Sequence, residues 1–456
     1  MRILLISSNT EVSPYPVYPL GMGIIAHALT TAGHDVRQFD FLERGASLDS
    51  MGREIALYNP ALIGISIRNI DNVNLINERY YIGAVQNIVQ KIRKLSTARV
   101  LLGGAGFSLM PERILRETGA DYGIVGEGER LIVDFVKNAE AGMYPEKPLL
   151  GPFRTEDDEE IRSAAYDEQL LAYYLKSGNI VSVQTKRGCP HRCVYCTYPL
   201  LEGRHLRARK AASVVDDIEL LRNRYNAKRL FFVDSIFNDD EGFYLELMEE
   251  MIRRKVNIQW TAFFKPDGLN EEAVKLMKNT GLAGAEIGAD AACDVTLKKM
   301  GKRFTFQDIV ASNGLFARYG ISVSNSFMFG GPGETEETVT EGIKNIQSLH
   351  KALNIIFMGI RILPNTPLAR IAEREAVISA DSDMLKPVYY ISPAVDKTWL
   401  KTTLTAAFQN TRHCIFPPDA IDNILTILHK MGYKSGPGIK PYTGHEREES
   451  LMNTTT

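Results

Sequence analysis

The sequence has no apolar run of about eighteen residues, the length that a membrane-spanning helix needs. Its charges nearly cancel, at a formal net charge of −2, so no overall field favours nucleic acid or an anionic membrane as a partner. It has only five cysteines, too few for a disulfide framework and typical of a reducing compartment. The short apolar stretch at the N-terminus lacks a signal-peptide cleavage pattern and is predicted to be a strand. These absences favour a cytoplasmic globular protein without a membrane span.

The few cysteines are concentrated in one place. Cys189, Cys193 and Cys196 have the spacing C-x3-C-x2-C. Three thiolates this close can hold three irons of a cubane iron–sulfur cluster and leave the fourth iron open to a small ligand. A structural zinc site with His191 as its fourth ligand is the alternative, although such sites usually pair two C-x2-C halves. The spacing therefore favours an iron–sulfur cluster.

Residues 1–140 alternate short apolar runs with helical stretches. This alternation predicts right-handed crossovers and a doubly wound parallel sheet of the Rossmann or flavodoxin type. The predicted strands are Arg2–Ser7, Val36–Phe41, Leu62–Ile67, Val100–Leu102 and Tyr122–Val125. Ligands of such sheets bind beyond the carboxyl ends of the strands.

The loops that follow the last three of these strands contain small and polar residues. They are Ser66, Arg68 and Asn69, then Gly103, Gly104 and Gly106, then Gly126, Glu127 and Gly128. Small residues let a backbone approach a large flat ligand closely, although ordinary turns also use glycine. No G-x-G-x-x-G follows the first strand, so a dinucleotide site is only weakly indicated.

The alternation of strands and helices restarts near residue 176. Six such units over residues 176–372 predict a partial (β/α)6 barrel of the TIM type, whose active sites lie at the carboxyl ends of its strands. Cys189 follows the first of these strands directly, so the cysteine loop is predicted at that end. Residues 141–175 are predicted to be a linker. Residues 373–456 are predicted to be a small, mostly helical region with a flexible tail that covers the barrel mouth.

Several segments carry a resemblance to known proteins. The runs Tyr18-Pro-Leu-Gly-Met-Gly, Gly103-Gly-Ala-Gly-Phe and Gly126-Glu-Gly-Glu resemble the cobalamin-binding domain that precedes many radical SAM cores. The runs Arg187-Gly-Cys-Pro-His-Arg-Cys-Val-Tyr-Cys196 and Phe329-Gly-Gly-Pro-Gly-Glu334 resemble the radical SAM superfamily. The chain as a whole is thus similar to the cobalamin-binding-domain radical SAM enzymes, which include the class B radical SAM methylases.

The resemblance implies three sets of site residues and no assigned catalytic side chain. The cluster ligands would be Cys189, Cys193 and Cys196. S-adenosylmethionine would contact Tyr195, Asp234, Asp290, Gly330, Gly331, Pro332 and Gly333, where Asp290 replaces the glutamate usual in the family. Cobalamin would contact the nine residues of the three N-terminal loops. The Asp-x-His-x-x-Gly motif that supplies a histidine to cobalt in other cobalamin proteins is absent, so no histidine ligand is expected.

The resemblance also implies a reaction. Reductive cleavage of S-adenosylmethionine at a 4Fe–4S cluster would give a 5′-deoxyadenosyl radical that abstracts hydrogen from a small-molecule substrate, followed by methyl transfer from methylcobalamin. A non-methylating cyclisation, ring contraction or rearrangement with the same cofactors is the first alternative. A non-catalytic or assembly protein is the second. The electron would come from a donor such as flavodoxin or ferredoxin, and no nucleic acid is expected as a partner.

Overall fold

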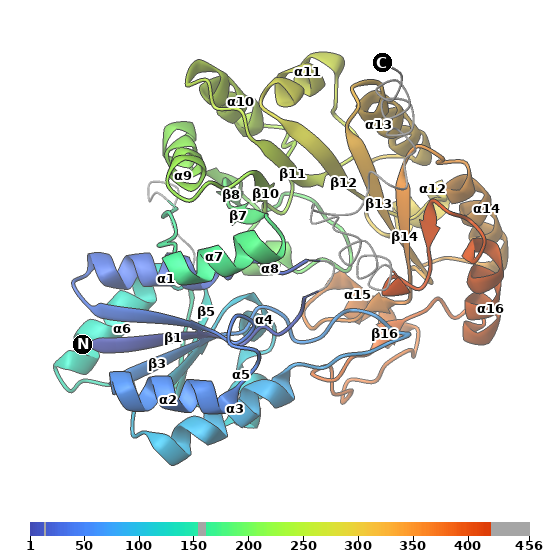
Figure 1. Cartoon of the computed structure of the whole chain (residues 1–456). Coiled ribbons are helices and arrows are strands. Elements are labelled where there is room, and N and C mark those ends of the chain that lie inside the picture. The colour runs from blue at the N-terminus through green and yellow to red at the C-terminus, as the bar shows by residue number, and fades with distance from the viewer. Residues whose placement is uncertain (13–14, 154–160, 421–456) are drawn as a thin grey trace.

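Two parallel sheets, one in each half of the chain, organise the structure (Figure 1). The computed structural model describes residues 1–12, 15–153 and 161–420. The N-terminal unit lies beside the carboxyl ends of the strands of the second sheet, and the C-terminal segments run along the junction (Figure 1). This α/β arrangement agrees with the fold predicted from the sequence.

The N-terminal sheet has six parallel strands in the order β2-β1-β3-β4-β5-β6. Their bounds are β1 (Arg2–Ser7), β2 (Asp35–Asp40), β3 (Leu62–Ser66), β4 (Arg99–Gly103), β5 (Tyr122–Gly126) and β6 (Leu149–Phe153). The central strands are apolar almost throughout because helices cover both faces of the sheet. This is the doubly wound sheet that the alternating sequence pattern predicts.

Two groups of helices bury the two faces of this sheet. The helices are α1 (Leu20–Thr31), α2 (Leu48–Tyr58), α3 (Ile82–Leu95), α4 (Ala105–Leu109), α5 (Pro111–Thr118) and α6 (Glu129–Glu140). On one face α1 packs with α6, and on the other α3 packs with α2 and α5. The hydrophobic core beneath α1 and α6 continues into the barrel, so the two halves of the chain share one buried cluster.

The predicted linker, residues 141–175, contributes regular structure. It supplies β6 as the edge strand of the first sheet and the helix α7 (Glu168–Ser177), which packs near β7 of the second sheet. The hydroxyl of Tyr174 on α7 donates to Asp40 at the end of β2, at 3.3 Å. The N-terminal sheet therefore extends past the predicted boundary at residue 140.

The second sheet forms an open barrel in which all paired strands are parallel, in the order β17-β14-β13-β12-β11-β10-β7. Its strands are β7 (Val181–Val183), β10 (Arg229–Phe232), β11 (Gln259–Phe264), β12 (Leu282–Asp290), β13 (Ser322–Phe329), β14 (Leu353–Met358) and β17 (Cys414–Ile415). The first six are the predicted ones. The short β17 was missed because two residues leave no periodic pattern.

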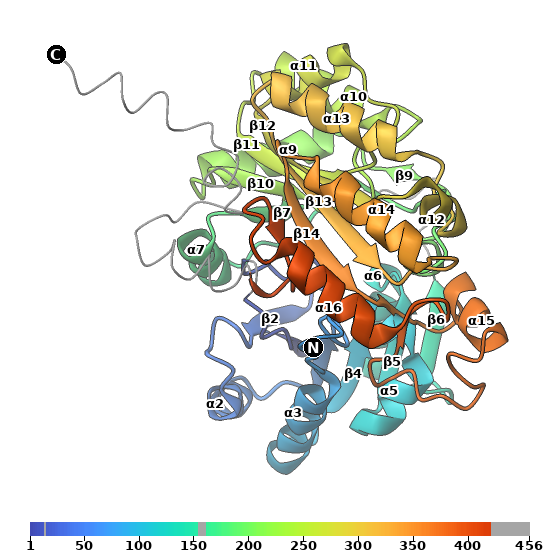
Figure 2. The same cartoon turned by 90° about the vertical axis from the view of Figure 1, so that its right-hand side faces the viewer.

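Helices cover the outer face of the barrel, with α13, α14 and α16 on the side seen in Figure 2. They are α9 (Ala211–Asn223), α10 (Phe243–Arg253), α11 (Glu271–Asn279), α12 (Asp294–Lys299), α13 (Phe306–Arg318), α14 (Glu336–Gln347) and α16 (Lys397–Phe408). The remaining elements are β8 (Lys186–Arg187), α8 (Tyr198–Leu201), β9 (Arg207–Ala208), β15 (Ile360–Arg361), α15 (Pro367–Arg374) and β16 (Tyr389–Tyr390).

The C-terminal region is helical in its described part, as predicted. It supplies α16, the helix α15 ends within it, and β16 pairs antiparallel with β15. The predicted flexible tail falls outside the described residues, which end at residue 420. In the part of the chain that the structure describes, no helix is both long enough and apolar enough to span a bilayer.

A buried ion pair joins the barrel to the N-terminal unit. The guanidinium of Arg361 on β15 donates to the Asp71 carboxylate at 2.8 Å and to the carbonyl of Met384 at 2.7 Å. Both charged side chains are almost inaccessible, at 4% and 1% exposure. The buried guanidinium is tolerated at this position because the Asp71 carboxylate compensates its charge. Arg361 is therefore a contact between the domains.

Candidate active site

The three cysteines lie on a loop that follows β8, at the carboxyl end of the barrel strands. The loop begins at Gly188, which has φ of +96° and where a Cβ would lie 1.9 Å from the carbonyl oxygen of His205. Only glycine fits this position. The amide of Cys189 donates to the carbonyl of Gly203, and that of Val194 to the carbonyl of Met300, both at 3.0 Å. Backbone contacts thus shape the loop before any metal binds.

The thiols lie in an environment that disfavours their charged form. Cys189 is buried, and Cys193 and Cys196 are half-buried. Burial raises the pKa of the Cys189 thiol and raises the pKa of the Cys196 thiol to about 12. Thiolates are the metal-ligating form, so iron must displace these protons.

The donor set suits a cluster better than a single metal ion. Among the residues that the structure describes, no three His, Cys, Asp or Glu side chains are arranged to hold a single metal ion. A cubane cluster instead takes each cysteine on a different iron, so its ligands need not converge on one point. Three free thiols on one anchored loop fit that chemistry.

Two predicted residues, Tyr195 and Asp290, meet a lysine beside the cysteine loop. The hydroxyl of Tyr195 donates to Asp290 Oδ2 at 2.5 Å. The Lys302 ammonium forms an ion pair with the same carboxylate and lies 3.2 Å from the Tyr195 hydroxyl. Burial disfavours the charged lysine, but the Asp290 carboxylate outweighs it and raises the pKa of Lys302 well above its ordinary value. The three side chains form a closed, charge-balanced group.

Lys302 was not predicted because nothing in the sequence distinguishes it from its neighbours Lys298 and Lys299. It becomes buried because Gly301, at φ +78°, turns the chain inward after α12. A Cβ at Gly301 would lie 2.4 Å from the carbonyl oxygen of Arg192 in the cysteine loop. The lysine and the cysteine loop are therefore positioned by one backbone contact.

Replacing Lys302 with methionine is expected to lower the free energy of unfolding by about 3–5 kcal/mol, because it leaves the Asp290 carboxylate buried without a cation. The matched control is Lys298→Met, an exposed lysine on α12, for which a change within about 0.5 kcal/mol is expected. Urea denaturation of both variants measures the difference. Equal stability of the two would contradict the assigned role of Lys302.

Asp234 lies just past β10, and its carboxylate already has several donors. It accepts from the amide and hydroxyl of Thr185, at 2.7 and 2.5 Å, and from the amide of Lys186 at 3.2 Å. The Lys186 ammonium lies 3.4 Å away. This carboxylate therefore fixes the strand ahead of the cysteine loop. Contact between Asp234 and S-adenosylmethionine stays a prediction.

The glycine-rich turn Gly330, Gly331, Pro332 and Gly333 follows β13 at the same end of the barrel. The Glu334 carboxylate accepts from the amides of Gly330 and Gly331, the latter at 3.1 Å. A Cβ at Gly330 would lie 3.2 Å from Ile391, and one at Gly331 would lie 3.2 Å from Met300. The turn is thus packed between the C-terminal region and the end of α12.

In the N-terminal unit, the predicted loop residues lie at the carboxyl edge of the sheet. Gly104 has φ of +99°, and a Cβ there would lie 2.6 Å from the carbonyl oxygen of Ile67. A Cβ at Gly106 would lie 3.0 Å from the carbonyl oxygen of Arg68. Glycine at these two positions lets two loop backbones touch. This contact alone explains why the positions are glycine, without a bound ligand. Their contact with cobalamin stays a prediction.

The remaining predicted residues of this edge differ in their surroundings. Arg68 and Asn69 are exposed and Ser66 is half-buried. A Cβ at Gly103 would meet nothing nearer than 4.0 Å. Gly126 and Gly128 lie on either side of the buried Glu127, and Gly126 has φ of +83°.

Glu127 links this edge to the cysteine loop. Its carboxylate accepts from Arg187 at 2.9 Å and from Arg207 at 2.5 Å. Arg187 also donates to Glu129 at 2.5 Å. The side chains of Arg187 and Glu127 are only 7% and 6% exposed. Because Arg187 directly precedes Gly188, the predicted cobalamin loop and the predicted cluster loop are joined by a buried ionic network.

A second contact joins the same two regions. Helix α4, which follows β4, packs against α8, which follows Cys196. Tyr198 on α8 is 38% exposed at this junction. The carboxyl ends of both sheets therefore face one another across α8 (Figure 1).

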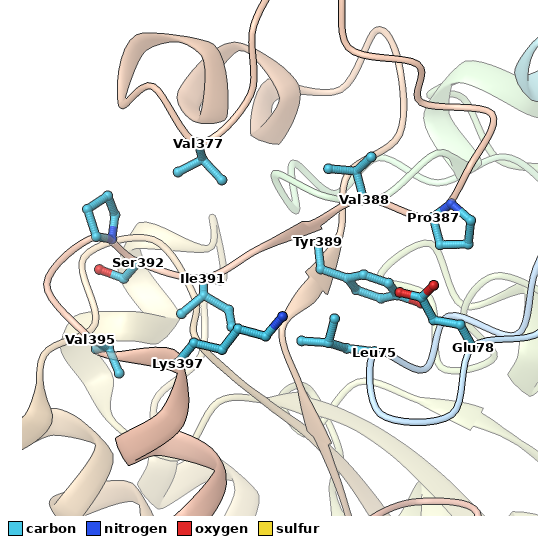
Figure 3. A pocket seen from close by; sticks show the side chains of 11 residues that line it. Leu75, Glu78, Val377, Pro387, Val388, Tyr389, Ile391, Ser392, Val395 and Lys397 are labelled. Atoms are coloured by element: carbon cyan, nitrogen blue, oxygen red, sulfur yellow. The ribbon is translucent and has the colours of Figure 1, made fainter.

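A cavity of about 430 Å³ opens at another part of the junction (Figure 3). Leu75 and Glu78 of the N-terminal unit line one side, and residues of the C-terminal region, Tyr389 and Lys397 among them, line the other. Ile391 lies between this cavity and Gly330. The C-terminal region thus borders this cavity, which the cysteines do not line.

Both halves of the chain match known protein families. The B12 binding domain matches residues 6–136, and the radical SAM superfamily matches residues 183–346. The tryptophan 2-C-methyltransferase of Streptomyces laurentii is 24% identical over 81% of this chain and 74% of its own length. An uncharacterised methyltransferase of Pyrococcus horikoshii is 25% identical over 82% of this chain and 83% of its own.

A solved structure shares the whole architecture. It is the radical S-adenosylmethionine methyltransferase TsrM from Kitasatospora setae, with cobalamin and a 4Fe–4S cluster bound. Its TM-score is 0.83 at 24% identity, and the match covers 97% of both chains. The likeness establishes the fold of both halves and their arrangement.

Proposed function

Because this chain belongs to the radical SAM enzymes that carry a B12-binding domain, we propose that it is a cobalamin-dependent methyltransferase acting on a small molecule. One observation carries the proposal. The cysteine loop at the carboxyl end of the barrel faces the loops at the carboxyl end of the N-terminal sheet, with α8 between them. Both fold types bind ligands at those ends, so two cofactors would share one enclosed space.

The proposed assignments follow the four predicted parts of the chain. Residues 1–140 would bind cobalamin, 176–372 would bind the cluster and S-adenosylmethionine, 141–175 would connect them, and 373–456 would border the substrate. When bound, the cluster supplies an electron that cleaves S-adenosylmethionine, and cobalamin supplies the methyl group. The cysteines would hold the cluster. Tyr195 and Asp290, fixed by Lys302, would orient S-adenosylmethionine against it.

The partners are part of the same proposal. An external donor such as flavodoxin or ferredoxin would reduce the cluster, and the protein would act in the cytoplasm without nucleic acid. The relative from Streptomyces laurentii is a tryptophan methyltransferase, which supports a small-molecule substrate here.

The test uses full-length protein reconstituted anaerobically with iron, sulfide and cobalamin. With S-adenosylmethionine labelled in its methyl group and a chemical reductant, label is expected to be recovered with the cobalamin extracted from the protein. This step needs no knowledge of the substrate. Reversed-phase chromatography in parallel measures 5′-deoxyadenosine.

The outcomes separate the alternatives. Release of 5′-deoxyadenosine without label on cobalamin would favour a cyclisation, ring contraction or rearrangement. Absence of both products would favour a non-catalytic or assembly protein. Label on cobalamin supports the methyltransferase.

A further inference from the structure

Two short segments beside the cysteine loop are strongly basic, although the charges of the whole chain nearly cancel. Between residues 186 and 210 the only acidic residue is Glu202, and between residues 298 and 303 there is none. Charge of one sign gathered at one place attracts a partner of the opposite sign. The basic residues of the two segments are Lys186, Arg187, Arg192, Arg204, Arg207, Arg209, Lys210, Lys298, Lys299, Lys302 and Arg303.

The fold separates these residues into two groups. Those whose side chains are covered have carboxylate partners within the chain: Lys186 with Asp234 and Asp239, Arg187 and Arg207 with Glu127, Arg209 with Asp217, and Lys302 with Asp290. Lys210 is exposed, but it is engaged elsewhere in the chain. The other exposed residues form no ion pair with any residue that the structure describes. We call these five the basic rim: Arg192, Arg204, Lys298, Lys299 and Arg303.

Backbone contacts hold the basic rim around the cysteine loop. Arg192 lies within the loop, directly before Cys193, and Arg204 donates to the carbonyl of His191 in the same loop at 3.2 Å. A Cβ at Gly301 would lie 2.4 Å from the carbonyl oxygen of Arg192, so the segment that carries the other three members touches the loop. The five cations therefore border the cluster ligands.

Acidic side chains beside this surface have a cation of their own. The Lys265 ammonium lies 2.6 Å from the Asp240 carboxylate and 3.6 Å from that of Asp267. The pKa of Asp240 lies below its ordinary value chiefly because of its hydrogen bond with Lys265, and the charges of His191 and Arg303 add to the shift. Arg303 therefore lies on the same side of the loop as His191, and the carboxylate near it is already bound.

The same surface gives access to the cluster ligands. Cys193 and Cys196 are only half-buried, whereas Cys189 is buried. Electron transfer slows steeply with distance, so an electron donor has to approach where the ligands are least covered. Val295 on α12, one helical turn before Lys298, is 54% exposed. Apolar side chains ringed by charged ones are typical of surfaces that bind proteins.

We propose that the basic rim docks an acidic electron-transfer protein of the flavodoxin class, which reduces the cluster held by the three cysteines. The inference rests on the proposed function and names the surface that its electron donor uses. One electron passes from the reduced flavin to the cluster, so the flavin is oxidised by one electron and the cluster is reduced by one. No bond to this chain forms or breaks. Opposite charges accelerate and orient such an encounter, which needs only a small interface.

The experiment uses full-length protein reconstituted anaerobically with its cluster, without S-adenosylmethionine or substrate. Stopped-flow absorbance follows the oxidation of a reduced, acidic flavodoxin mixed with the protein. The double variant Lys298→Glu with Arg303→Glu is expected to lower the second-order rate constant about tenfold or more at low salt. At about 1 M salt the difference is expected to vanish, because exposed charges are then screened. Both residues lie outside the cysteine loop, so iron analysis should show an unchanged cluster content.

The matched control reverses two lysines at the other end of the barrel. Lys228 and Lys351 are exposed, form no ion pair with any described residue, and precede β10 and β14, at the amino end of the sheet. Lys228→Glu with Lys351→Glu changes the net charge equally but should leave the rate constant nearly unchanged. Arg303→Lys, which keeps the charge, should also retain it. Photoreduced 5-deazaflavin, a small reductant that needs no docking surface, should reduce the cluster of every variant at the same rate.

Three results would overturn the inference. Equal slowing by the two double variants would show that net charge, and not the basic rim, steers the donor. Failure of the flavodoxin to reduce a cluster that 5-deazaflavin does reduce would exclude the partner. Tighter binding of a mixed-sequence RNA oligonucleotide than of flavodoxin, lost in Lys298→Glu with Arg303→Glu, would assign the basic rim to nucleic acid.

The outcome is separable from that of the proposed function. The labelling test uses a chemical reductant and no donor protein, whereas the stopped-flow test involves no methyl transfer. Failure of one therefore leaves the other standing. A protein in which even 5-deazaflavin finds no reducible cluster would overturn both.

Discussion

Replacing Cys193 with alanine is expected to abolish the iron–sulfur cluster. Only two cysteines of the loop would remain, so two of the four irons would have no thiolate ligand. Because the loop supplies all of the protein ligands, a cluster with two thiolates is not expected to stay bound. Iron should fall from about four per chain toward zero, with loss of the visible absorbance, and 5′-deoxyadenosine release should fall to background. Iron analysis and the absorption spectrum after anaerobic reconstitution measure the effect.

Cys414→Ala is the matched control. Cys414 is also a free thiol, but it is buried on β17, away from the cysteine loop. Its variant should keep the full iron content. A full iron content in Cys193→Ala would refute the ligand assignment.

Replacing Arg187 with methionine is expected to have the second large effect. Arg187 directly precedes Gly188, where the cysteine loop begins, and its guanidinium donates to Glu127 and Glu129 at the edge of the N-terminal sheet. Removing one member of a buried ionic group leaves uncompensated charge, at a cost of about 3–5 kcal/mol. The cysteine loop would also lose its attachment to the N-terminal unit. We expect a lower urea midpoint and reduced iron retention.

Arg113→Met serves as the control for this effect. Arg113 also bridges distant parts of the chain, reaching Asp383 at 3.2 Å, but both side chains are about 40% exposed. An exposed pair contributes at most about 1 kcal/mol and is screened by salt. If both variants lose the same free energy of unfolding, the buried network around Arg187 does not attach the cysteine loop to the N-terminal unit.

The elements of regular structure were largely readable from the sequence. β1 has the predicted bounds, because apolar periodicity and flanking turn residues are local signals. β17 and β6 were not predicted, since a strand of two residues and one interrupted by glycine and proline carry no periodicity. The cysteine loop was readable for a different reason. Its ligands are adjacent in the chain.

Other parts of the site could not be read in this way. Lys302 looks like any lysine of a charged run until the turn at Gly301 brings it to Asp290. Gly104 and Gly106 resembled a ligand-binding loop, yet they touch the backbone of a neighbouring loop. In each case the partner lies far away in sequence.

The sequence by itself determined the two α/β units, the three cluster cysteines and the resemblance that links them to S-adenosylmethionine and cobalamin. Only the tertiary structure decided which charges are paired. It joined Glu127 to Arg187 across the two domains and paired Lys302 with Asp290. The physical reason is that strand periodicity and ligand spacing depend on near neighbours, whereas the balance of buried charge depends on groups that meet only when the whole chain has folded.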